Sequence, residues 1–261
     1  MNLFELRGTL NEKTQAVIGI VGGLFLLFVW YFVTAINLVP PTLLPSPVAV
    51  IQCLPELHFD DAMVRQLGRS MYLNLMGYIE AVVVCVPLGF LIGLFPLFKG
   101  LFAKPVDAIR FIPLTAITGL FIVWFGIFDM MKIQFLAFGI IVYLLPVVVQ
   151  RVEQVENVYQ QTAFTLGATK WQTIKTVFFP AVFSKLFDDI RVLVAISWTY
   201  IIVAEMVNNN GGIGAMLFTS ARQSRIDKVF ALLFVIVVVG FIQDIIFKAL
   251  DKQFFPYKHK V

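Results

Sequence analysis

The chain has 261 residues, of which 59% are hydrophobic and only 14% are charged. Soluble domains carry about 25% charged residues, so this composition excludes a protein that lies wholly in water. The 20 Lys and Arg residues exceed the 16 acidic residues and give a net charge of +4. In a membrane protein this excess is expected to face an anionic leaflet, so it does not indicate binding to nucleic acid.

Six apolar runs approach the length of about 20 residues that a helix needs to cross the hydrocarbon core. They cover residues 16–36, 71–98, 111–128, 133–149, 192–207 and 229–250. Because lipid offers backbone groups no water, each run is predicted to be a helix. The first run is uncharged and lacks a small-residue cleavage site, so we expect a retained anchor rather than a signal peptide. The sequence therefore predicts an all-α membrane protein with six transmembrane helices in a single domain, 1–261.

The distribution of Lys and Arg predicts the orientation. Placing both termini in the cytoplasm puts fourteen of the twenty basic residues inside and six outside, as the positive-inside rule requires. The first outer connection, 37–70, begins with four prolines that forbid a regular helix, and an amphipathic stretch is expected to follow along the outer surface. Those prolines are Pro40, Pro41, Pro45 and Pro47. Cys53 lies in this connection and Cys85 in the second run, so no disulfide is expected.

The longest inner connection, 151–191, has the pattern of a helix, a break and a second helix. Residues 155–166 form a good helical stretch, and Gly167 is the usual residue for a left-handed C-terminal cap. Thr169 is predicted to cap the start of the second helix, with Gln172 completing a capping box. A bundle of membrane helices does not need this projection for its own stability. We therefore expect another protein to dock on it.

This loop resembles the cytoplasmic motif of binding-protein-dependent ABC importer permeases, which has the form E-A-A, three residues, G, nine residues, I-x-L-P. The matching residues are Gln161, Thr162, Ala163, Gly167, Val177, Phe178, Phe179 and Pro180. The spacing agrees at every anchor, while Gln161, Thr162 and Phe179 depart from the motif. Pro180 is kept and is expected to close the helical unit. The resemblance implies a coupling helix that seats on an ATPase. The residues placed at that ATPase-coupling site are Gln161, Thr162, Ala163, Gly167, Thr169 and Pro180.

Further matches narrow the resemblance to permeases of the nitrate, sulfonate and taurine type. The matching segments are Arg191, Ser197-Trp198, Ala204-Glu205-Met206, Gly211-Gly212-Ile213-Gly214, Leu44-Pro45-Ser46-Pro47, Arg110-Phe111-Ile112-Pro113 and Trp124-Phe125-Gly126. The resemblance implies a type I ABC importer-like permease of the bacterial cytoplasmic membrane that works by alternating access. It also implies a dimer with a second copy or a homologue, partner ATPase subunits that bind ATP and Mg²⁺, and a periplasmic or lipoprotein solute-binding protein. The implied substrate is a small anion.

Polar residues inside the predicted spans are candidates for the translocation path. These candidates are Glu205, Ser197, Thr199, Tyr200 and Glu80. Packing is the alternative role, because Ser and Thr also join membrane helices to one another, and Glu80 is expected to have a structural partner. Asp244 and Lys248 are four residues apart and predict an ion pair near the inner interface.

No catalytic or metal-binding set can be assembled from the sequence. His58 and His259 are predicted on opposite sides of the membrane, and no G-x-x-x-x-G-K phosphate loop occurs. We therefore expect a non-catalytic subunit without a cofactor of its own, driven by a partner ATPase. The alternative is a secondary transporter or channel that is not driven by ATP. That alternative leaves the inner loop without a role, and no internal repeat supports it.

Overall fold

The computed structural model describes residues 11–207 and 210–259. Every regular element in that part of the chain is a helix, and it contains no strand. Five of these helices are long and apolar enough to cross a membrane, and the count rises to six if the bent pair α5–α6 forms one broken span. The all-α membrane fold is therefore confirmed. The chain divides into two compact units, 1–61 with 219–234 and 62–218 with 235–261, and a single domain over 1–261 stays a prediction.

In the first unit, α1 (Glu12–Ala35) is an apolar helix whose most hydrophobic window has no buried residue. A helix that is apolar on all sides suits a lipid environment. Near its end, Trp30 Nε1 donates a hydrogen bond to Pro45 O at 3.0 Å. The Trp30 ring also lies 5.9 Å from that of Phe230, near the start of α12 (Ile226–Phe254). These contacts fix the C-terminal end of α1 to the remainder of its unit.

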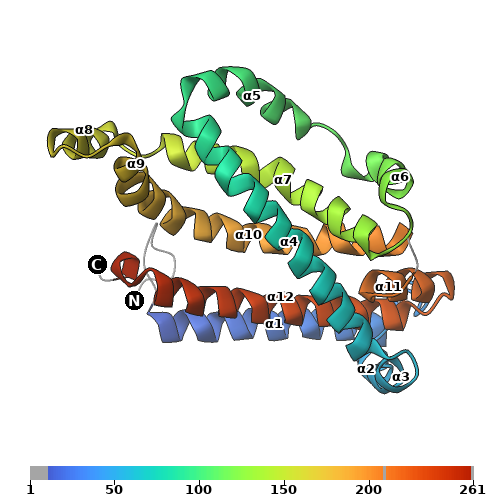
Figure 1. The fold of residues 1–261 in the computed structure, drawn as a ribbon. Helices are drawn as coiled ribbons and strands as arrows, with labels where there is room; N and C mark the ends of the chain where they lie inside the picture. Colours follow the sequence, from blue (N-terminus) through green and yellow to red (C-terminus); the bar gives the residue numbers. More distant parts are fainter. Residues whose placement is uncertain (1–10, 208–209, 260–261) are drawn as a thin grey trace. The chain divides into compact units, whose positions relative to one another are not determined.

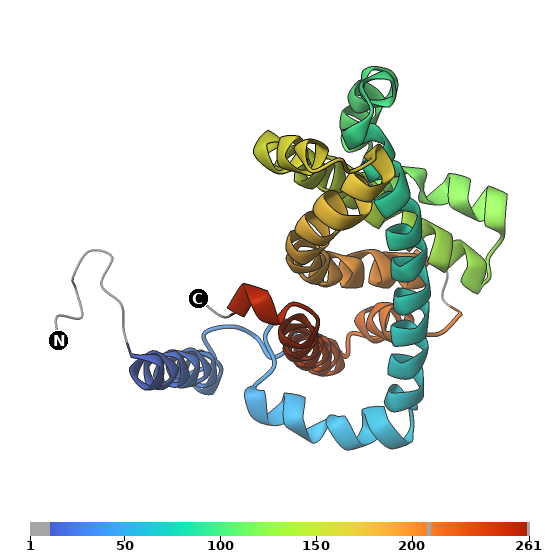
Figure 2. The same cartoon turned by 60° about the vertical axis from the view of Figure 1, so that its left-hand side comes forward.

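Two short helices, α2 (Pro47–Gln52) and α3 (Leu54–Phe59), follow the proline-rich stretch (Figure 2, light blue). Ser46 is the N-cap of α2, and its hydroxyl accepts a hydrogen bond from the Ala49 N–H at 3.2 Å. A proline at the first helical position suits this start, because its missing N–H would have had no partner there. The helix therefore begins at Pro47 itself, the last of the four prolines, rather than after it.

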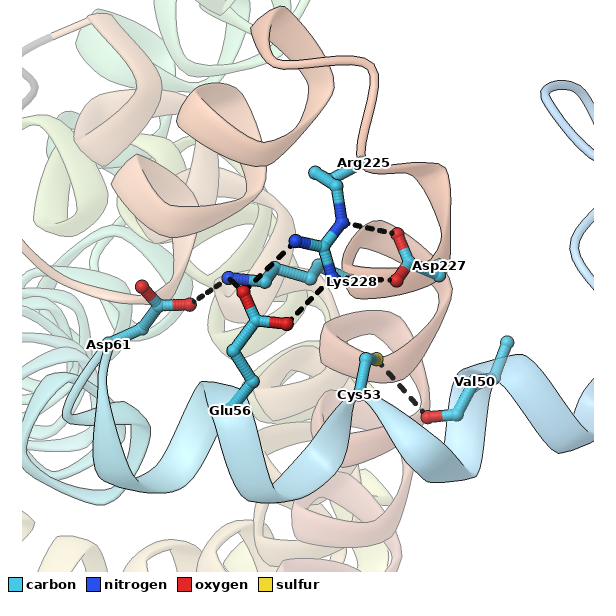
Figure 3. A network of polar contacts seen from close by, with 7 residues as sticks. All are labelled: Val50, Cys53, Glu56, Asp61, Arg225, Asp227 and Lys228. Carbon is cyan, nitrogen blue, oxygen red and sulfur yellow. Dashed lines mark hydrogen bonds and ion pairs between the residues drawn. The ribbon is translucent and has the colours of Figure 1, made fainter.

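Five charged side chains, which we call the α3–α12 ion cluster, join α3 to the start of α12 (Figure 3). They are Glu56, Asp61, Arg225, Asp227 and Lys228. Arg225 donates to both carboxylate oxygens of Glu56, at 3.0 and 2.8 Å, and to both of Asp227, at 3.1 and 2.9 Å. Lys228 Nζ lies 2.8 Å from Glu56 and 2.5 Å from Asp61. Such bidentate pairs fix geometry as well as supply energy.

The ion cluster should stabilise the fold at neutral pH, and the contribution of Glu56 should be lost only on acidification. Hydrogen bonds from Arg225 and Lys228 lower the pKa of Glu56 from 4.5 to about 2. A depressed pKa stabilises the fold above the unfolded value, and this contribution is lost as the pH falls from about 4.5 toward 2. The difference in free energy of unfolding between the wild type and Glu56→Gln should therefore be constant above about pH 5 and shrink below it. Thermal unfolding in detergent at stepped pH measures this difference, and a difference that grows on acidification would contradict the assignment.

Three long helices form the core of the second unit: α4 (Met63–Leu94), α7 (Asp129–Glu153) and α10 (Phe179–Val207). Figure 1 shows α4 crossing α7, with which it makes its most extensive contact. Gly89 permits this approach, because a Cβ there would lie 2.4 Å from a side-chain carbon of Val148. Close packing of this kind, rather than the hydrophobic effect, holds helices together in lipid.

The predicted third span, 111–128, differs from the structure. In its place, α5 (Pro96–Ile109) and α6 (Leu114–Phe125) form a pair bent by 104°. With 12 residues, α6 measures about 18 Å, which is too short to cross the bilayer alone. Pro113 is the reason for the break, because it lacks an N–H and keeps the residue before it out of the helical region. The hydropathy pattern identified the apolar helix α6 but not α5, the more charged helix before it.

Three further elements follow α10 in the chain: α11 (Ile213–Arg222), α12 and the 3₁₀ turn η2 (Pro256–His259). The structure also extends α10 well ahead of the predicted run at 192–207. Of the polar residues that interrupted the hydropathy signal there, four have partners within the protein: Ser184, Asp188, Asp189 and Arg191. Asp189, for example, forms an ion pair with Arg151 of α7 at 2.6 Å.

Candidate functional site

The inner loop folds as a helix followed by a glycine elbow. Helix α8 (Asn157–Thr165) starts two residues later than predicted and ends before Gly167, whose φ is +82°. The Gly167 N–H donates to Phe164 O at 2.9 Å, and the Ala168 N–H donates to Ala163 O at 3.0 Å. Helices commonly end in this way, with a glycine in the left-handed region and two N–H groups donating back to carbonyls of the last turn. The predicted cap is present.

A capping box begins the second helix of the loop, α9 (Lys170–Thr173). The Thr169 hydroxyl accepts from the Gln172 N–H at 3.3 Å, and the Thr169 N–H donates to Gln172 Oε1 at 2.7 Å. Each side chain thereby accepts a hydrogen bond from a backbone N–H that has no partner within the helix. The break between the two helices is thus defined on both sides by local interactions, as the sequence predicted.

The prediction that Pro180 closes this unit is wrong. A short π-helix, η1 (Ile174–Phe178), connects α9 directly to α10, and Pro180 is the second residue of α10. The helix runs on through η1, and a π-helical turn locally alters the hydrogen-bond pattern, which accommodates the N–H that Pro180 lacks. As a consequence, α9 is continuous with α10, a helix long and apolar enough to span a membrane.

The elbow is open to contact. None of the residues of α8 is buried, and Leu166 and Trp171 are 82% and 72% exposed. Among the six predicted coupling residues, Gln161, Thr162, Gly167, Thr169 and Pro180 are exposed and Ala163 is half-buried. Their contact with an ATPase stays a prediction.

At the other end of α10, Glu205 is fully buried and holds the start of α11. Its carboxylate accepts from the Ser70 hydroxyl at 2.7 and 2.9 Å and from the Gly214 N–H at 2.8 Å. Ser70 in turn accepts from the Ile213 N–H at 2.8 Å. A carboxylate at a helix N-terminus is favoured because the first N–H groups have no partners within the helix. Glu205 thus acts as a cap supplied by a neighbouring helix.

The turn that Glu205 holds is also pinned by α4 and α7. The Gly212 N–H donates to Gln66 Oε1 at 2.8 Å, and Lys132 Nζ donates to Gly211 O at 3.2 Å. Both glycines have positive φ, and a Cβ at Gly212 would lie 2.1 Å from Glu205 Oε1. Only glycine fits at Gly212, since a side chain there would occupy the place of the carboxylate. Two residues of the predicted turn, Asn208 and Asn209, lie outside the described residues.

Residues 85–255 match the family described as "binding-protein-dependent transport system inner membrane component". The chain belongs to this family. It is therefore a multi-pass inner-membrane permease, the transmembrane subunit of an ABC importer. Family membership decides against the secondary transporter or channel that the sequence left open.

Curated relatives of this permease cover nearly its whole length. It is 26% identical over 260 residues to the taurine transport permease TauC of Escherichia coli, covering 98% of this chain and 94% of that protein. It is 27% identical to the putative aliphatic sulfonates permease SsuC of Bacillus subtilis, over 90% of this chain and 85% of that one. The nitrate import permease NrtB of Synechocystis is 27% identical, over 83% of this chain and 82% of its own length.

Among solved structures, an inward-facing form of the MetNI methionine ABC transporter is similar, with a TM-score of 0.65 and 16% identity. The match covers 73% of the permease and 95% of that chain. At this level of identity the likeness concerns the fold alone, and it confirms the predicted type I importer-like architecture.

The remaining path candidates of the permease differ in their exposure. Ser197 is fully buried, 2.9 Å from Asn74 Oδ1 and 2.7 Å from Val194 O, which suits a residue that joins α10 to α4. Thr199 is exposed, and Tyr200 is half-buried. Thr199 and Tyr200 therefore present polar groups to the surroundings of the helix bundle, whereas Ser197 does not.

Sequence reasoning missed Tyr143, which stacks on Tyr200 with ring centroids 6.5 Å apart. At 40% exposure, Tyr143 is the only exposed residue between Met131 and Val149 of α7. One signal was available in the sequence, because tyrosine in membrane helices usually lies at the lipid–water interface, whereas Tyr143 lies in the middle of its helix. A polar ring at that depth on an exposed face is a candidate for contact with the path.

The other membrane charges are paired. Both carboxylate oxygens of Glu80 accept from Gln134 Nε2, at 2.9 and 2.8 Å, so Glu80 has the partner on a neighbouring helix that was expected. Asp244 forms the predicted pair with Lys248 at 2.8 Å and a second one with Arg191 at 2.5 Å. Within residues 11–207 and 210–259, no group of three or more His, Cys, Asp or Glu could hold a metal ion. The side chain of His259 lies outside the described residues.

Proposed function

We propose that the permease works as a dimer in which each copy docks one ATPase subunit on its α8–α9 elbow. The observation that carries the proposal is the exposed elbow at the motif spacing, continuous with α10 through η1. One chain has one elbow, whereas ATPases of this kind act in pairs, so two permease chains are required. ATP and Mg²⁺ are bound by the ATPase, and this chain takes no part in the hydrolysis and holds no cofactor.

Transport then proceeds by alternating access. A loaded solute-binding protein docks on the outer face, and ATP closes the ATPase pair, which displaces both elbows and opens the path outward. Hydrolysis and release return the permease to its inward state. To move an equilibrium from 1:99 to 99:1, ATP binding must favour the outward state by about 5.5 kcal/mol.

The proposed substrate is a small oxyanion of the sulfonate, taurine or nitrate class. Its support is that relatives carry the names of taurine, sulfonate and nitrate permeases. The hydroxyl groups of Thr199, Tyr200 and Tyr143 are suitable donors to the oxygens of such an anion. Glu205 would repel an anion and already has donors within the fold, so we assign it to holding the outer turn.

Uptake into proteoliposomes that contain the permease, its copurifying ATPase and its solute-binding protein tests this proposal. Labelled taurine, an alkanesulfonate and nitrate are supplied in parallel, with and without ATP. We expect ATP-dependent uptake of at least one of the three. Uptake that follows an ion gradient without ATP would overturn the mechanism. ATP-dependent uptake of a cation or a sugar alone would overturn only the substrate class.

The proposed orientation predicts the sidedness of two cysteine variants. Lys175→Cys, near the elbow, should react with an impermeant maleimide only from the cytoplasm, and Asp60→Cys, next to α3, only from outside. Both parent side chains are exposed. The native Cys53 and Cys85 are 4% and 0% exposed and give a low background. Reaction of Lys175→Cys from the outer face would contradict both the orientation and the docking proposal.

A further inference from the structure

An apolar cavity of about 560 Å³ lies beside the coupling elbow. Its walls include Tyr159, Thr162, Ala163, Leu166, Val177 and Tyr257. Five of these belong to the inner loop, while Tyr257 comes from η2, at the other end of the second unit's sequence. We call this cavity the Tyr257 pocket. Its volume is within the range of pockets that bind ligands and side chains.

The position of Tyr257 is fixed on both sides. Before it, Phe255 is only 8% exposed and its ring lies 5.7 Å from that of Phe187 on α10. After it, Lys258 Nζ forms ion pairs with Asp188 at 2.5 Å and with Asp251 at 3.2 Å. The Tyr257 ring itself remains 56% exposed. These contacts fix the backbone on both sides of Tyr257, so the ring is held beside the pocket.

The walls of the pocket are apolar yet open. Tyr159 and Leu166 are 56% and 82% exposed, and α8 buries none of its residues. Exposed apolar surface next to a rigid, polar-capped turn is typical of a protein interaction site. Thr162 and Ala163, which belong to the predicted ATPase-coupling residues, are part of the same wall. The pocket is therefore continuous with the surface on which the ATPase is proposed to dock.

We propose that the ATPase subunit inserts an apolar side chain into the Tyr257 pocket, so that it contacts η2 as well as the elbow. This inference rests on the proposed function, in which the elbow is the docking surface. The second contact ties the ATPase to α10 and to the end of α12, because Lys258 joins these two helices through Asp188 and Asp251. The ATPase thus engages two membrane helices of one permease chain at one site.

Substitutions at Tyr257 test the contact. In purified complexes, Tyr257→Ala should weaken the affinity for the ATPase about tenfold, because a tyrosine in a pocket is a common hot spot. Tyr257→Phe keeps the ring and should bind within about twofold of the wild type. Lys252→Ala, a change at an exposed position in the last turn of α12, is the matched control. Because the Tyr257 ring is largely exposed, its removal should leave the melting temperature of the permease unchanged. Equal affinity of Tyr257→Ala and the wild type would overturn the inference.

A photo-crosslinking amino acid in place of Tyr257 identifies the occupant directly. In membranes that contain the complex, the adduct should have the mass of one permease plus one ATPase chain and should disappear when the ATPase is omitted. Adducts only with lipid, or only with a second permease, would overturn the inference. The proposed function is judged separately by Gly167→Val. If that variant uncouples transport while position 257 neither crosslinks nor affects affinity, the elbow is the docking surface and the Tyr257 pocket is not part of it.

Discussion

Gly167→Val should abolish ATP-coupled transport while the permease still reaches the membrane in normal amounts. Gly167 has φ +82°, and a Cβ built there meets no atom within 4 Å. The cost of the substitution is therefore conformational rather than steric. A non-glycine residue in the left-handed region costs about 1–3 kcal/mol, and a β-branched one is disfavoured there most. The chain should relieve this strain by reorienting α9, which forms part of the proposed docking elbow.

Two controls separate conformation from side-chain bulk. Gly167→Asn should retain most of the activity, because asparagine tolerates the left-handed region. Gly100→Val introduces the same side chain at a glycine that also has open space around it but has no positive φ, and it should transport at a rate near that of the wild type. The measurement is ATPase activity stimulated by the loaded binding protein, together with uptake. Normal coupled activity in Gly167→Val would show that the loop is an ordinary connection.

Glu205→Ala should lower both transport and stability, with transport falling to below about a tenth of the wild-type rate. The substitution removes the acceptor for the Ser70 hydroxyl and for the Gly214 N–H. Each buried donor left without a partner costs about 1–3 kcal/mol. It also leaves Lys132, which is fully buried, without the carboxylate near it. We expect the melting temperature to fall by at least about 5 °C.

Asp244→Asn is the matched control for Glu205→Ala. Asp244 is also a membrane carboxylate, but its side chain is 34% exposed, and its partners Arg191 and Lys248 are 30% and 53% exposed. Loss of this carboxylate should therefore lower the free energy of unfolding by less than about 1 kcal/mol. Most of the transport rate should remain. A Glu205→Ala permease with normal stability and a raised KM would show that Glu205 contacts the substrate. That result would contradict the structural role assigned to it here.

The helical membrane character and the α8–α9 elbow were determined by the sequence itself. The apolar composition alone requires membrane-spanning helices, because backbone groups in lipid must form their hydrogen bonds within the protein. The elbow could also be predicted from the sequence, because its hydrogen bonds join residues no more than five apart. Examples are Ala168 to Ala163 and Thr169 to Gln172. Interactions of this range depend on residue type and spacing and hardly on the remainder of the fold.

The break in the third span shows the limit of hydropathy. A window average recognises apolar length, so it reported the run at 111–128 and did not register that Pro113 divides α5 from α6. Pro180 shows a second limit. Proline usually interrupts a helix, yet Pro180 is the second residue of α10. Which of the two occurs depends on the turn that precedes the proline, and the sequence alone does not decide that.

Only the tertiary structure decided what the buried charges do. Glu205 stood in the sequence as a candidate for the path, yet its partner Ser70 is 135 residues away. Arg225 and Glu56 are separated by 169 residues, and the anchors of Tyr257 come from two different helices. Such pairs depend on the rotation and depth of helices that pack against each other, which a shift of one residue would change. A buried carboxylate must find donors wherever the packing places them, so its role follows from the fold rather than from its position in the sequence.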